Sequence, residues 1–137
     1  MGKTRGVRGA TMPGTGRHAA GIRGADARRI TREVLAPHRV SERLLGDVLT
    51  VVGELVSNAI RHAGGVTAFD VRHLHDEVAV EVSDASPLLP HAAGTPVTVP
   101  GGFGWLLVNT MAARTEISVG PDGKTITAYL SVTATMA

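Results

Sequence analysis

The sequence contains no cysteine. Disulfide bonds and thiolate metal sites are therefore excluded, and the composition suits a reducing cytoplasm, where we expect the protein to reside. No apolar run approaches the roughly 20 residues that cross a bilayer, so we expect no membrane association. The basic N-terminus is not followed by an apolar stretch, which argues against a secretory signal. The 137 residues suit one domain with its own core.

Acidic residues are scarce at the N-terminal end. Residues 1–40 hold nine Lys or Arg against Asp26 and Glu33, a charge of +7 that leaves −5 for the remainder. Residues 1–24 are rich in Gly and Arg without sustained periodicity, so we expect a basic flexible leader before a domain at 25–137. Such a leader can contact nucleic acid or an acidic partner. It has no aromatic residue to stack on bases, which favours a soluble leader over nucleic-acid binding.

The clearest helical pattern lies at residues 42–63. Six apolar residues recur at the spacing of one helical stripe and predict the core face: Leu44, Val48, Val51, Val52, Leu55 and Ala59. Ser41 suits the N-cap, and Gly64-Gly65 ends the helix. A shorter amphipathic stretch predicts an earlier helix that begins near Ala25 and stops near Pro37.

Glu54, Asn58 and His62 recur at four-residue steps on a neighbouring face of the long helix. A carboxylate, an amide and an imidazole in one row can hold a metal ion and activate a hydroxyl or a water. A solvated face with an i,i+4 hydrogen bond explains the same residues. On this helix alone, the solvated face is the simpler interpretation.

After the long helix the hydrophobic period changes to two, which is typical of strands. Residues 66–75 and 78–83 predict an antiparallel hairpin. The alternation places on one side of its first strand Val66, Ala68, Asp70, Arg72 and Leu74. Residues 116–120 and 124–132 predict a second hairpin, closed by the turn Pro121-Asp122-Gly123. Helices segregated from hairpins indicate an α+β fold, a two-layer α/β sandwich with a mostly antiparallel sheet and helices on one face.

Two further stretches carry candidate binding groups. Asp84 stands where the chain leaves a strand, and a Pro-rich segment at 88–102 predicts a long, mobile loop. The glycines of 101–104 open the next helix, where backbone N–H groups favour an anion such as phosphate. Each stretch alone is explained by an ordinary turn. Their order after the polar row favours a nucleotide site.

In this order the three stretches resemble the GHKL (histidine-kinase-like) ATPases. ELVSNAIRH is similar to their N-box, DASPLLP to their adenine-binding box, and GGFGWLLV to the glycine box behind their ATP lid. The resemblance covers residues 25–132 and is closest to the stand-alone serine/threonine kinases that act as anti-sigma factors. It implies the Bergerat ATP-binding fold, with ATP and Mg²⁺ as cofactors.

The resemblance also implies a role for each matching residue. Asn58 would give a side-chain oxygen to Mg²⁺, and Glu54 would act as general base toward the attacking hydroxyl. Asp84 would accept a hydrogen bond from the adenine amino group, while Gly102 and Gly104 would cradle the phosphates. The remaining candidates support the metal ligand (His62) or wall the base (Ile60, Pro87 and Leu107).

The implied function is that of an ATP-dependent protein serine/threonine kinase. Its substrate would be a STAS-type antagonist (anti-anti-sigma) protein, a sigma factor would be a second partner, and a homodimer is compatible with both. Phe103 stands where the family commonly has a basic residue, and Trp105 replaces the usual leucine. These departures favour nucleotide binding over phosphoryl transfer, and the alternative function is an ATP-dependent binding module that sequesters a partner without catalysis.

Other sites are poorly supported by spacing. GPDGKT has two residues between its glycines where a P-loop needs four. His73 and His75 share one strand face and can bind Zn²⁺, yet no third ligand is evident nearby. No nucleophile elbow with a Ser/His/Asp order is present.

Overall fold

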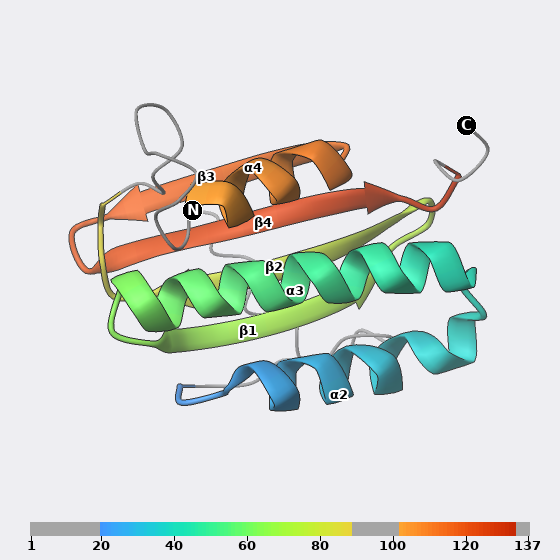
Figure 1. The fold of residues 1–137 in the computed structure, drawn as a ribbon, viewed down its shortest axis with the longest axis horizontal. Coiled ribbons are helices and arrows are strands. Elements are labelled where there is room, and N and C mark those ends of the chain that lie inside the picture. Colours follow the sequence, from blue (N-terminus) through green and yellow to red (C-terminus); the bar gives the residue numbers. More distant parts are fainter. Residues whose placement is uncertain (1–19, 89–101, 134–137) are drawn as a thin grey trace.

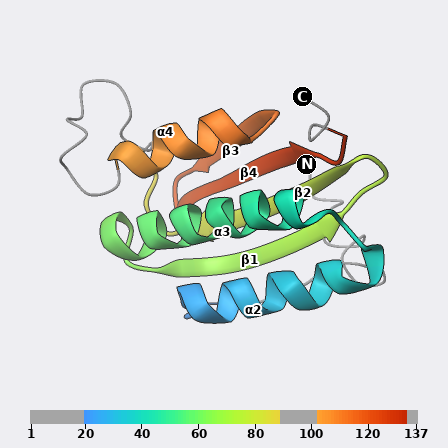
Figure 2. The same cartoon turned by 45° about the vertical axis from the view of Figure 1, so that its right-hand side comes forward.

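The computed structural model describes residues 20–88 and 102–133, with the backbone alone for residues 102 and 103. Its elements, in chain order, are α2 (Gly24–Leu35), the 3-10 turn η2 (Ala36–His38), α3 (Glu42–His62), β1 (Val66–His73), β2 (Glu77–Asp84), α4 (Gly102–Met111), β3 (Arg114–Gly120) and β4 (Gly123–Ser131). The four strands form one sheet in the order β1-β2-β4-β3, with every neighbouring pair antiparallel. The helices form a second layer, with α3 between α2 and α4 (Figures 1 and 2). The predicted α+β sandwich is confirmed.

Helix α3 forms as predicted because its start, its stripe and its end are all locally encoded. Ser41 Oγ accepts the N–H of Leu44 at 3.0 Å and caps the first turn. All six residues of the predicted stripe are buried, and Val56 joins them. Gly64 and Gly65 follow the helix with φ of 80° and 116°, a conformation that glycine adopts without strain. The helix therefore presents its last two turns in a fixed orientation.

Both predicted hairpins are present, with one correction. The register between β1 and β2 shifts between Val66 and Ala68, which marks a bulge. Val66 is therefore buried in the core with Phe69 and Val71, and its predicted place on the side of Ala68 and Asp70 is wrong. The extra residue reverses the alternation that the sequence pattern assumes.

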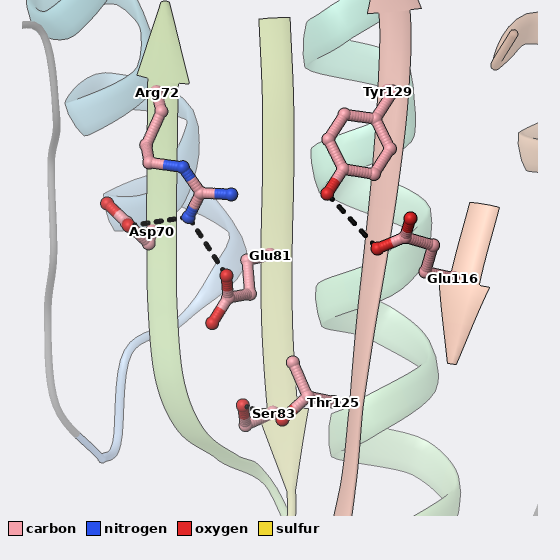
Figure 3. A network of polar contacts seen from close by, with 7 residues as sticks. All are labelled: Asp70, Arg72, Glu81, Ser83, Glu116, Thr125 and Tyr129. Carbon is pink, nitrogen blue, oxygen red and sulfur yellow. Dashed lines mark hydrogen bonds and ion pairs between the residues drawn. The ribbon is translucent and has the colours of Figure 1, made fainter. Parts of the chain in front are cut away.

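The sheet face away from the helices carries a polar network (Figure 3). Arg72 Nη1 donates to Asp70 Oδ2 at 3.0 Å and to Glu81 Oε1 at 2.9 Å, and the Arg72 side chain is only 10% exposed. Burial alone would lower the pKa of Arg72, but the hydrogen bonds with Glu81 and Asp70 outweigh it and raise the pKa. Arg72 is therefore a permanent cation that joins β1 to β2.

Helix α4 packs on the core through a face that its sequence does not mark. Its apolar residues surround the whole helix, so the sequence does not indicate which face is buried. Trp105 and Val108 enter the core, whereas Leu106 is 45% exposed. Within the described part of the chain, no helix has the length and apolarity needed to cross a membrane.

His73 belongs to an aromatic stack and to no metal site that the structure shows. Its ring lies 4.0 Å from that of His38, with 7° between the planes. The described residues contain no group of three or more His, Cys, Asp or Glu side chains arranged for a metal ion. Burial, and then the charge of His38, lower the pKa of His73 below its ordinary value of 6.5.

This lowered pKa predicts that acid destabilises the fold. The unfolded chain binds a proton at His73 more readily than the folded chain, so the free energy of unfolding should fall as the pH drops below about 6.5. Urea unfolding between pH 7.5 and pH 5 measures this fall. In His38→Gln, which removes the neighbouring charge, NMR titration should give a higher pKa for His73. A wild-type pKa at or above 6.5 contradicts the prediction.

Candidate functional site

The three predicted stretches lie at the same end of the sandwich. The C-terminal turns of α3, the end of β2 and the start of α4 all gather there (Figure 1). The sheet register explains part of this arrangement, because Asp84 at the end of β2 pairs with Val66, which follows α3 closely. Residues more than 40 positions apart in the chain therefore share one region.

Glu54 and Gly104 are in direct contact, which joins α3 to α4. A Cβ placed on Gly104 would overlap Glu54 Oε1 and come within 3.1 Å of its Cδ. The Glu54 carboxylate therefore lies against the backbone of the first turn of α4, in space that only glycine leaves open. This contact brings the predicted general base to the predicted phosphate-binding turn.

Asn58 stands one turn beyond Glu54 on α3, and no described residue pairs with its amide oxygen. Oδ1 is buried and accepts no hydrogen bond from any residue that the structure describes. A buried acceptor without a donor costs roughly 1–3 kcal/mol, so it is retained where it has another use. A hard cation that prefers oxygen ligands fits this atom, and Asn58 is therefore a suitable ligand for Mg²⁺.

Asp84 is buried at the end of β2 and is held by two neighbours. Its Oδ1 accepts the backbone N–H of Ser86 at 2.9 Å, which forms the Asx-turn, and Lys124 Nζ lies 3.1 Å from each carboxylate oxygen. The predicted strand end is confirmed. The lysine was missed, although its place in the pattern with Ile126 and Ala128 puts a charged residue on an apolar side.

The outer candidates are less enclosed. Ile60 is 47% exposed, Pro87 is exposed and Leu107 is half-buried, so the described residues do not yet form a closed wall around a base. His62 is exposed in the last turn of α3. The predicted mobile loop and the predicted basic leader fall almost wholly outside the described residues. Gly102 begins α4, as the glycine box predicts.

Trp105, which departs from the resembling family's pattern, has a packing role. It is buried in the core cluster, and its carbonyl oxygen accepts a hydrogen bond from Asn109 Nδ2 at 3.0 Å. The larger side chain therefore fills space between the helices and the sheet. The departure at Trp105 is therefore no argument against phosphoryl transfer at this site.

The chain belongs to the histidine kinase-like ATPase domain family. The family model, described as "Histidine kinase-like ATPase domain", matches residues 20–130. These residues extend from just before α2 to near the end of β4. No curated protein gives a significant match to the chain. The protein is thus an ATP-binding domain of this class, and its fold agrees with that family.

Proposed function

We propose that the protein binds ATP with Mg²⁺ at this end of the sandwich and transfers the terminal phosphoryl group to a serine or threonine hydroxyl of a partner protein. The observation that carries the proposal is the close pairing of Glu54 with Gly104, one turn before the Asn58 oxygen, to which no residue in the described ranges donates a hydrogen bond. An acid, a metal-ligating oxygen and a glycine-opened helix are the parts that phosphoryl transfer needs.

Each residue has one task in this proposal. Asn58 holds Mg²⁺, which neutralises charge on the phosphates. Glu54 accepts the proton of the attacking hydroxyl while the new O–P bond forms and the bond to the leaving ADP oxygen breaks. The first turn of α4 donates backbone N–H groups to the phosphates, and Asp84 accepts from the adenine amino group. His62 supports the C-terminal end of α3, which carries the proposed metal ligand Asn58.

The proposed partner is a STAS-type antagonist protein, with a sigma factor as a second partner that the domain sequesters. Support comes from the resemblance of the three sequence boxes to those of anti-sigma-factor kinases, over nearly the whole matched domain. Such a protein would act in the cytoplasm, where its partners are found. A homodimer is compatible with this function.

Asn58→Leu tests the metal ligand. Leucine has a similar shape and removes an oxygen that has no described donor, so stability without ligand should be unchanged or higher. Calorimetry should show Mg²⁺-dependent ATP binding that is weaker by about tenfold or more. Asn58→Asp, which changes the charge around the metal and keeps the shape, should also alter the Mg²⁺ dependence. Unchanged Mg²⁺-dependent ATP binding by both variants would contradict the proposed Mg²⁺ site.

The second candidate function is an ATP-dependent binding module without catalysis. Phe103 favours it, because a basic residue is common there in the resembling family and an added cation would stabilise the transferring phosphoryl group. Incubation with labelled ATP and a STAS-type partner separates the two functions. Label on the partner supports the kinase, whereas a stable ATP-dependent complex without label supports the module.

A further inference from the structure

Lys124 shares the buried corner of Asp84 and has no role in the function proposed above. Its side chain is 7% exposed, and Nζ lies 3.1 Å from both carboxylate oxygens and 3.2 Å from the carbonyl oxygen of Ser86. The register of β2 and β4 sets Lys124 directly opposite Asp84. A Cβ on Gly123 would overlap the Asp84 carbonyl oxygen, so the strands approach as closely as glycine allows. The backbone therefore fixes the ammonium beside the carboxylate.

The contacts of this pair leave capacity for a ligand. A carboxylate offers about four acceptor sites, two on each oxygen. Oδ1 uses both, for Ser86 N–H and Lys124, whereas Oδ2 contacts Lys124 alone among the described residues, as an ion pair. The Lys124 ammonium has three protons. One is directed at the carboxylate and one at Ser86 O, so the third remains for a ligand. The pair thus offers one acceptor next to one donor.

We propose that Lys124 is a specificity-determining residue that donates a hydrogen bond to N1 of adenine while Asp84 accepts from the exocyclic amino group. The inference rests on the proposed function, because it takes Asp84 as the residue that holds the base. Adenine carries a donor beside an acceptor on this edge and matches the pair. A 6-oxo purine carries the reverse order, and sets its oxygen against the carboxylate and its N1–H against the ammonium.

The test compares ATP with 1-deaza-ATP, in which N1 is replaced by a C–H group. The wild type should bind 1-deaza-ATP about 10- to 100-fold more weakly than ATP, the ratio expected for a lost hydrogen bond from a charged donor. Lys124→Met keeps the length of the side chain and removes the donor, so it should bind the two ligands equally. Calorimetry with Mg²⁺ at one salt concentration measures all four affinities, and 7-deaza-ATP serves as the control that loses a different ring nitrogen.

The outcomes separate this inference from the proposed function. Equal binding of ATP and 1-deaza-ATP by the wild type overturns the role of Lys124 alone, as does an unchanged preference in Lys124→Met. A wild type that binds no ATP overturns the proposed function and this inference with it. The methionine variant can fail to fold because its buried carboxylate has lost its cation. In that case the wild type still decides, because its affinity must fall with 1-deaza-ATP and not with 7-deaza-ATP.

Discussion

Replacing Gly104 with alanine is expected to lower phosphoryl transfer by about 10²-fold or more while the domain stays folded. The new Cβ would occupy the place of Glu54 Oε1, and the Glu54 carboxylate, at the end of a flexible side chain, would move away. A displaced general base typically costs 10²- to 10⁴-fold in rate. Alanine also has a higher helix propensity than glycine by about 1 kcal/mol, which offsets strain in α4.

The measurement is the rate of label transfer from ATP to the partner protein, compared with that of Glu54→Gln. If both substitutions act through the same carboxylate, the double variant should be no slower than the slower single variant. Gly46→Ala is the matched control, since it lies on α3 and a Cβ there meets nothing within 4 Å. Transfer at the wild-type rate by Gly104→Ala would contradict the assigned role of Glu54.

The sequence predicts those features of the fold that are encoded locally. Helix α3 has its stripe, its Ser41 cap and its Gly64-Gly65 end within one continuous stretch, and all three are confirmed. The bulge at Val66 was missed because one inserted residue reverses the alternation, and the preceding Gly64 and Gly65 are already explained by the end of the helix. In α4 the buried face could not be predicted, because apolar residues surround the helix.

The candidate site divides in the same way. Glu54 and Asn58 are one turn apart on a single helix, so their common face follows from the helical period alone. The contact of Glu54 with Gly104 depends on how α3 packs on α4, and the sequence indicates it only through the order of the boxes. The ion pair of Asp84 with Lys124 depends on the register of two strands that are 40 positions apart, which no local pattern determines.

Arg72→Met is expected to destabilise the fold by about 3–5 kcal/mol, the loss typical of removing one partner from a buried ion pair. Asp70 and Glu81 stand opposite each other in the register, with side chains 5% and 14% exposed. Arg72 is the cation that both contact, and methionine would leave two close carboxylates facing each other, which is unfavourable on a sheet. Denaturant unfolding at neutral pH measures the loss, and adding Asp70→Asn and Glu81→Gln should recover most of it.

Arg114→Met is the matched control, because the sheet carries a second arginine on the same face. The register aligns Arg72, Ala79, Tyr129 and Arg114 across the four strands. Arg114 also contacts a carboxylate, Glu77 at 2.6 Å, but its side chain is 51% exposed, and water screens such a pair. Its loss should cost no more than about 1 kcal/mol. Similar losses for the two arginines would show that burial does not determine the strength of the Arg72 network.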